Sequence, residues 1–178
     1  MRRHDPPIGA SEAMKAVVMT GVFLGIGLMG ALDEIVFHQM LQWHNFYVGT
    51  TQYWRIFSDG AFHVFTATVL FLGAMRLWAQ RRRVSTVVSG RPLWAGLLMG
   101  LGGFQLFDGI VNHKILQLHP VREGVEEIWP YDLAWNIPAA AILLAGWLLW
   151  RSLRAEDAVA PGPVDDAAVE RGAALRRR

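Results

Sequence analysis

Cysteine is absent from the chain, and its absence excludes several kinds of site. Disulfide bonds and metal sites built on thiolates both require cysteine, and a c-type haem is attached through a Cys-x-x-Cys-His motif. Any metal or cofactor site in this protein must therefore be built from histidine, carboxylate and other side chains without a thiol.

Charged residues are scarce, because they make up 18% of the 178 residues whereas hydrophobic residues make up 53%. The net charge is only +2, and most Lys and Arg residues lie in short flanks and tails, so no nucleic-acid partner is expected. Motifs of soluble enzymes are missing as well. No Gly-x-Ser-x-Gly sequence surrounds Ser58, and the glycines at 100, 102 and 103 lie inside an apolar run rather than after a strand.

Long hydrophobic runs are abundant, and each of the four is close to the roughly 20 residues that span a bilayer. The first run also contains Asp33, Glu34 and His38, which a cleaved signal peptide would not need. We therefore predict an all-α membrane protein whose four transmembrane helices form a four-helix bundle. The expected spans are 16–42, 57–78, 93–118 and 131–150.

The distribution of Lys and Arg predicts the orientation of these spans, because cytoplasmic loops carry an excess of both residues. Basic residues gather before the first span, between the second and third, and after the fourth, but not in the other two loops. We expect a multi-pass protein of the bacterial plasma membrane with both termini in the cytoplasm. The bundle would occupy residues 1–155, and the unpatterned segment 156–178 would be a disordered cytoplasmic tail.

One segment occurs twice, since residues 31–44 read ALDEIVFHQMLQWH and residues 106–119 read LFDGIVNHKILQLH. Ionisable groups inside apolar helices are costly and are therefore candidates for a functional site. The repeated polar positions, 75 residues apart, are Asp33 and Asp108, His38 and His113, Gln42 and Gln117, and His44 and His119.

The similarity extends into the following span of each half, where an Asp precedes a His or an Asn by four residues. These pairs are Asp59 with His63 and Asp132 with Asn136. The repeat is thus one of two helices, covering 16–78 and 93–151, and predicts a two-plus-two parallel arrangement about an axis normal to the membrane. Glycines four residues apart in the first and third spans predict close helix packing.

The depth of the polar residues, taken at about 1.5 Å per helical residue, predicts three layers. One layer would lie about 9 Å from the outer ends of the helices. Asp59 and Asp132 would lie nearer the surface, and Asp33 and Asp108 deeper. The middle layer would contain His38, His63, His113 and Asn136.

Three imidazoles from different helices, with carboxylates beside them, suit a transition metal such as Zn, Cu or Fe. Carboxylates complete such a site or orient the rings from behind. In a zinc site, Asp59 or Asp33 would be the general base that activates a bound water. The candidate metal ligands are His38, His63, His113, Asp33, Asp59, Asp108, Glu34, His44, His119 and Asp132.

The spacing of Asp33 and His38 creates a geometric difficulty. Residues five apart lie about 140° from each other around a straight α-helix, so both cannot face one point. A π-bulge would bring them onto one face. Alternatively, Asp33 shares a face with His44 while His38 shares another with Gln42, and the two faces serve different contacts.

At these residues the chain resembles an uncharacterised bacterial membrane family, domain of unknown function 2243. The family pattern is Asp-Gly-Ile-Val-x-His, then Ile-Leu-Gln-Trp-His, then Asp-Gly-x-x-His. It corresponds here to residues 33–44 and 59–63, and the resemblance covers roughly 16–151. Glu34 departs from the pattern, where Gly is expected. The resemblance implies the four-span fold and gives no activity.

Three functions are consistent with these residues. The first is a membrane metalloprotein in the lipid bilayer, with redox or hydrolytic chemistry and a homo-oligomer or redox partner. The second is a b-type haem electron-transfer protein, in which His38 and His113 would be the symmetric axial pair. The third is a small proton or cation transporter, in which the same groups would relay protons or bind the ion.

Overall fold

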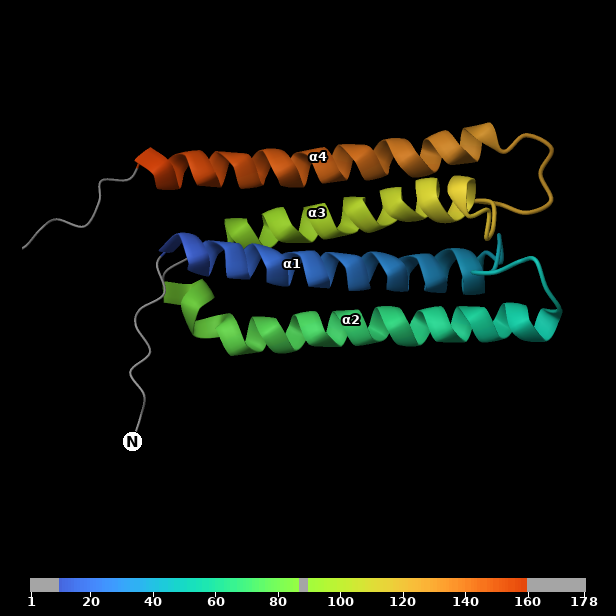
Figure 1. Ribbon diagram of the computed structural model, residues 1–178, viewed down its shortest axis with the longest axis horizontal. Coiled ribbons are helices and arrows are strands. Elements are labelled where there is room, and N and C mark those ends of the chain that lie inside the picture. Colours follow the sequence, from blue (N-terminus) through green and yellow to red (C-terminus); the bar gives the residue numbers. More distant parts are fainter. Residues whose placement is uncertain (1–9, 87–89, 160–178) are drawn as a thin grey trace, which may run out of the picture.

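The computed structural model describes residues 10–86 and 90–159, which contain helices and no strand. Each helix is long and apolar enough to cross a membrane when its continuation is included, so the prediction of an all-α protein with four membrane-length helices is confirmed. The helices are α1 (Ala10–Asp33), α2 (Gln52–Thr86), α3 (Arg91–Phe107) and α4 (Trp129–Val159) (Figure 1).

Two of the helices continue as π-helices, in which a backbone N–H bonds to the carbonyl five residues earlier. Helix α1 continues into η1 (Glu34–Met40), and α3 continues into η2 (Asp108–Ile115). Leu41 N–H donates to the Val36 carbonyl at 2.8 Å, and Leu116 N–H donates to the Val111 carbonyl at 2.7 Å. The wider turn therefore occurs at the same place in both copies of the repeated segment.

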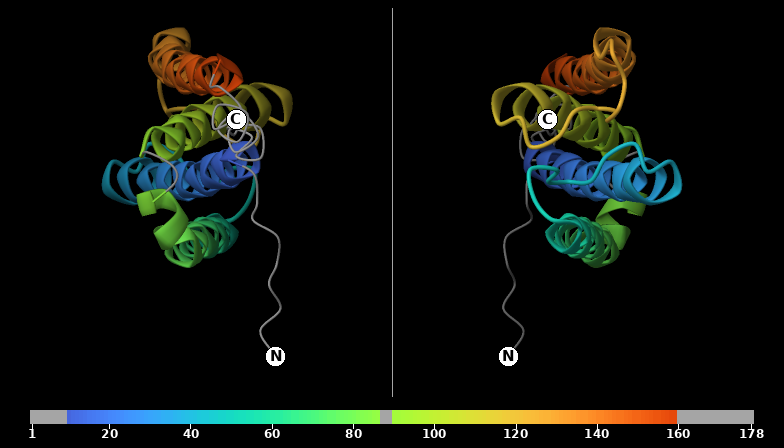
Figure 2. Two further views of the ribbon diagram at one scale, coloured as in Figure 1. Left: turned by 90° about the vertical axis from the view of Figure 1, so that its left-hand side faces the viewer. Right: turned by 90° about the vertical axis from the view of Figure 1, so that its right-hand side faces the viewer.

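The helices lie in the order α2, α1, α3, α4, as the views along the helices show (Figure 2). Helix α1 packs against α2 and α3, and α3 also packs against α4. In the described part of the chain, α2 and α4 do not pack against each other. The four helices thus form an open row, in which α1 and α3 are central and any site shared by the two halves must lie between them.

Glycines allow the two central helices to touch along their backbones. A Cβ atom added at Gly21 would overlap the backbone of α3 at Gly96, and one added at Gly25 would overlap it at Gly100. Gly21 and Gly96, like Gly25 and Gly100, are 75 residues apart in the sequence. The predicted small-residue packing therefore occurs here, and it brings equivalent positions of the two halves into contact.

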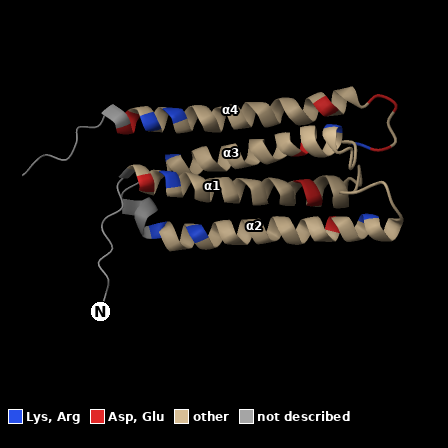
Figure 3. Cartoon of the chain, in the orientation of Figure 1, with Lys and Arg blue, Asp and Glu red and all other residues tan. Residues whose placement is uncertain are grey.

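The two connections 41–51 and 116–128 lie together at one end of the row, and the start of α1 and the end of α4 lie at the other (Figure 1). Lys and Arg residues gather mainly at the latter end (Figure 3). Helix α4 extends to Val159, into the tail predicted from residue 156. The rest of that tail, 160–178, lies outside the described residues.

Candidate metal centre

The π-helices bring each repeated Asp next to the His five residues later. His113 Nε2 lies 2.9 Å from Asp108 Oδ2, and His38 Nε2 lies 3.7 Å from Asp33 Oδ2. On a regular α-helix these side chains would point about 140° apart. Of the two arrangements that the sequence left open, the structure has the one in which a π-helix joins Asp and His.

A sharp turn after each π-helix returns a second histidine to the same place. Gln42 has φ 51° and Gln117 has φ 50°, in the left-handed region that residues other than glycine seldom adopt. The chain then folds back across the helix ends, so that His44 and His119 are only 1% and 2% exposed. Their rings stack, with centroids 4.4 Å apart and planes 13° apart.

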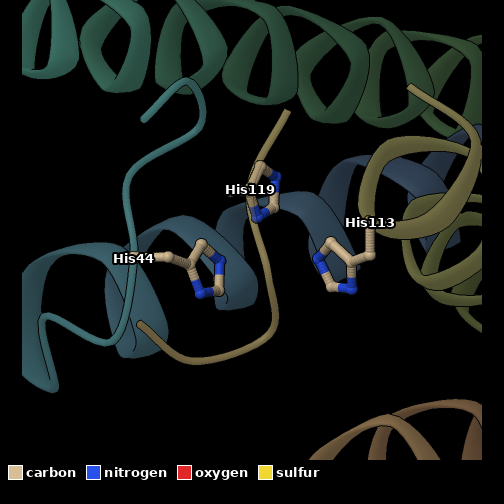
Figure 4. Close-up of side chains that lie close together, drawn as sticks. All are labelled: His44, His113 and His119. Atoms are coloured by element: carbon tan, nitrogen blue, oxygen red, sulfur yellow. The ribbon is translucent and has the colours of Figure 1, made fainter. Parts of the chain in front are cut away.

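Four imidazole rings form one continuous cluster between the two halves. The centroids of His38 and His44 are 4.5 Å apart, and those of His113 and His119 are 4.6 Å apart. Figure 4 shows His44, His113 and His119 converging from two loops and a helix. Together with Asp33 and Asp108 these residues form what we call the His/Asp cluster, with one Asp and two His from each half.

Many nitrogen and oxygen atoms of the His/Asp cluster lack a hydrogen-bond partner. A buried polar group without a partner costs about 1–3 kcal/mol, so these atoms need another partner. His113 Nε2 and Asp108 Oδ2 are close but not aligned for a hydrogen bond, as expected of two atoms that face one ion. Among the described residues, the buried unpartnered atoms include Asp33 Oδ1, His38 Nε2, His44 Nε2, Asp108 Oδ2 and both ring nitrogens of His113 and His119.

Distances within the cluster suit a small metal ion. Two sets of three ligand atoms lie within 4.8 Å of one another, namely Asp33, His38 and His44, and His44, His113 and His119. Ligands at ~2.0–2.1 Å from a tetrahedral metal are about 3.3 Å apart, so modest side-chain adjustment would close either set around an ion.

His44 and His119 have the protonation state that a metal ligand needs. Burial, together with the nearby His119 and His38, lowers the pKa of His44 to about 2. Burial likewise lowers the pKa of His119 to about 4. Both imidazoles are therefore neutral near pH 7. His44 Nδ1–H donates to the Val121 carbonyl at 2.7 Å, which fixes the ring and leaves Nε2 facing the cluster.

Carboxylates hold His38 from the side away from the cluster. Its Nδ1 lies 3.0 Å from Glu34 Oε2 and 3.0 Å from Asp59 Oδ1. Asp59 in turn accepts hydrogen bonds from Asn45 Nδ2 at 2.5 Å and from the Phe46 backbone N–H at 2.6 Å. Glu34, His38 and Asp59 also meet the distance criterion for a metal site. Because Asp59 already accepts these hydrogen bonds, we interpret it as a supporting carboxylate that orients His38 rather than as a metal ligand.

The second half supports its histidine differently. Asn112 Nδ2 donates to Asp108 Oδ1 at 2.8 Å, so an amide on η2 fixes the carboxylate. Gly109 occupies the position of Glu34, and a Cβ there would overlap Asn136 Oδ1 and the Trp135 ring. The contact with α4 thus leaves no space for a second glutamate, which explains the difference between the two copies.

His63 does not join the cluster, although its depth placed it there. Its side chain is exposed, and Phe62 is the buried neighbour whose ring stacks on His38 at 5.7 Å and 26°. The buried face of α2 is formed by Asp59, Phe62 and Thr66, at helical spacing, and His63 lies outside that stripe. Depth alone did not specify which face of the helix points inward.

Asp132 and Asn136 also lie apart from the imidazoles. Asp132 forms an ion pair with Lys114 at 2.5 Å, and Asn136 Nδ2 donates to the Asp132 backbone carbonyl at 2.9 Å. Lys114 therefore pairs with Asp132. The sequence pattern equated Asp132 with Asp59, yet only Asp59 contacts a histidine of the cluster.

Two polar cavities reach the His/Asp cluster from the end of the row that carries both loops. One, of about 560 Å³, is bordered by His38, His44 and Asp59, and the other, of about 410 Å³, by His113 and His119. Glu123 borders both cavities, and it forms an ion pair with Arg55 across the two loops. Each half of the cluster therefore borders its own cavity at the loop end.

Comparison with known proteins identifies a family. A family model described as "Predicted membrane protein (DUF2243)" matches residues 20–153. This range includes α2, α3, both π-helices and the whole His/Asp cluster. No curated protein and no solved structure matches the chain significantly.

Proposed function

The chain belongs to this family of predicted membrane proteins, whose description gives no activity, and from the side-chain geometry we propose that it binds a transition metal at the His/Asp cluster. The observation that carries the proposal is the convergence of four buried imidazoles and two carboxylates whose inward atoms lack partners. Without an ion, several buried polar atoms of the cluster would have no partner, and the loss of their hydration would not be compensated.

The donor set indicates the class of metal. Neutral imidazole nitrogen and carboxylate oxygen suit Zn, Cu(II) or Fe, and the absence of thiolates disfavours sites for softer ions. Asp33, His38 and His44 would hold an ion on the side of the first half, or His44, His113 and His119 would hold one on the side of the second half, where Asp108 lies beside His113. His44 has one free nitrogen, so it can complete only one of the two sets. A bound metal would supply Lewis-acid or electron-transfer chemistry.

A b-type haem has less support from the geometry. Axial histidines must lie on opposite faces of a porphyrin, with the macrocycle between them. Here neighbouring rings contact each other, and His44 and His119 stack directly at 4.4 Å. A separation of the symmetric pair His38 and His113 by a haem would require the whole cluster to open.

A transport function also has less support, because among the described residues of the two central helices no ionisable side chain continues the cluster into the membrane-spanning part. Helix α1 contains no ionisable side chain between Lys15 and Asp33, and α3 contains none between Arg91 and Asp108. Glycine backbones touch along this stretch of the two helices. An ion that enters from the loop end would therefore meet a tightly packed apolar interface.

Elemental mass spectrometry on the protein purified in detergent tests the proposal. Wild-type protein should contain a transition metal in a fixed ratio to protein, and His44→Gln should lose most of it, because His44 belongs to both sets of three ligands. His63→Gln is the matched control, since it removes an imidazole that is exposed and outside the cluster. Wild-type protein that neither contains metal nor takes it up on dialysis would contradict the proposal, as would equal metal content in both variants.

A further inference from the structure

A large apolar cavity lies beside the His/Asp cluster, and the proposed metal site does not use it. Its volume is about 710 Å³, within the range of small-molecule sites. It lies between the first turns of α2 and the end of α3. The lining that matters here consists of Phe46, Trp54, Phe57, Phe62, Phe104 and Asn112.

Aromatic rings form the wall of this cavity nearest the cluster. The rings of Phe46 and Phe62 are 4.9 Å apart with planes 18° apart, and those of Phe62 and Phe104 are 6.1 Å apart with planes 15° apart. Phe62 also stacks on His38. A wall of near-parallel rings suits a flat aromatic ligand, because aromatic groups gain energy from offset stacking or edge contacts beyond simple burial.

Asn112 supplies a hydrogen-bond acceptor to this otherwise apolar wall. Its Nδ2 donates to Asp108 Oδ1, and a carboxylate can only accept, so the orientation of the amide is fixed. No hydrogen bond to Asn112 Oδ1 occurs within the described residues, and Asn112 borders the cavity. A ligand whose hydroxyl donates a hydrogen bond to this oxygen would be connected to Asp108 through the amide of Asn112.

The cavity is open towards the membrane. Trp54, Phe57, Phe65 and Phe107 border it, and each of these side chains is more than half exposed. All four belong to helices of membrane-spanning length, so their exposed faces would meet lipid. A ligand would enter this cavity from the bilayer, whereas a cation would reach the cluster through the polar cavities.

We propose that this cavity binds a membrane-soluble molecule of the phenol or quinol class, with a planar aromatic head group whose hydroxyl donates to Asn112 Oδ1. A saturated acyl chain would bury apolar surface against these rings, but it would leave Asn112 Oδ1 without a donor. The proposal concerns binding only. It does not depend on the identity of the metal or on its presence.

Fluorescence quenching tests the proposal, because Trp54 borders the cavity. The probe is 4-dodecylphenol with two bromine atoms on its alkyl chain, added to the full-length protein in phosphatidylcholine nanodiscs. Saturable quenching should occur in the wild type and disappear in Trp54→Phe. The brominated dodecylbenzene without a hydroxyl should bind about three- to tenfold more weakly, as the loss of one hydrogen bond predicts.

Three variants separate the proposed site from general partitioning. Ala61→Phe fills the cavity and should abolish saturable quenching, whereas Ala134→Phe, at the corresponding exposed position of α4, should not. Asn112→Leu should bind the phenol and the alkylbenzene equally. Equal affinity of the two probes for the wild type would overturn the proposal, and so would quenching that persists in Ala61→Phe. Metal content is measured on the same samples, so that a failure of phenol binding can be distinguished from a failure of metal binding.

Discussion

At the scale of single residues, His38 connects the proposed metal ligands to their supporting groups. Nε2 faces Asp33 in the cluster, while Nδ1 faces Glu34 and Asp59 on the other side of the ring. A carboxylate behind a metal-binding imidazole fixes its tautomer and increases its basicity. Asp59 is itself fixed by Asn45 and the backbone of Phe46, so its position is set before any ion binds.

Asp59→Asn should therefore weaken metal binding without removing a ligand. We expect metal affinity to fall about 10- to 100-fold, as is usual when such a supporting group is replaced, while the metal-to-protein ratio at saturation stays unchanged. Titration of metal-free protein with zinc, in competition with a chromophoric chelator, measures both quantities. Asp132→Asn is the matched control, because that carboxylate pairs with Lys114 and should leave the affinity unchanged. A lower saturating ratio in Asp59→Asn would instead make Asp59 a direct ligand.

The individual residues of the cluster could be predicted only in part. Repetition identified Asp33, His38, Asp108 and His113, because four polar groups recur at one offset in apolar helices. His44 was also a candidate, but the turn at Gln42 that buries its ring was not predictable from the sequence. The supporting roles of Asn112 and Val121 carry no recognisable signal, because an amide and a backbone carbonyl act here through tertiary position alone.

At the scale of elements, the π-helices are the feature that joins the sequence pattern to the site. The five-residue spacing of Asp and His predicted a π-bulge as one of two solutions, because only an i to i+5 turn aligns such a pair. The extent of η1 and η2 and the turns that follow could not be predicted, since Gln has no preference for the left-handed region. These turns depend on contacts between the two loops, such as the bond from Glu123 N–H to the Trp43 carbonyl.

A one-residue deletion inside η1 should be tolerated better than one inside α1. Deletion of Ile35 places Asp33 and His38 four apart, a spacing that shares one face of an ordinary α-helix. Deletion of Leu28, which is similarly exposed, turns Asp33 and everything after it by about 100° relative to the glycine contact with α3. We expect the first variant to retain most of its metal and the second to lose it, by elemental analysis at equal helical content in circular dichroism. Equal loss in both would show that η1 itself is required.

At the scale of the whole molecule, the open row explains why the site lies where the two halves meet. Composition was sufficient to predict four membrane-length helices, and the repeat indicated which residues correspond. The order α2, α1, α3, α4 was not predictable, because a helix that faces lipid and a helix that faces protein are both apolar. The central helices touch at Gly21 and Gly96. His44 and His119 stack at the opposite end of the same two helices, where the two loops meet.

The orientation of this row in the membrane can be measured directly, because the natural chain has no cysteine to give background labelling. Basic residues such as Arg91 and Arg151 should hold their end in the cytoplasm. Glu126 is exposed in the loop beside the cluster, and Gly90 is exposed at the opposite end with open space around it. In intact cells, a membrane-impermeant maleimide should label Glu126→Cys, and it should label Gly90→Cys only after the membrane is permeabilised. The reverse pattern would place the His/Asp cluster at the cytoplasmic side, so that the proposed metal would be drawn from the cytoplasm rather than from outside.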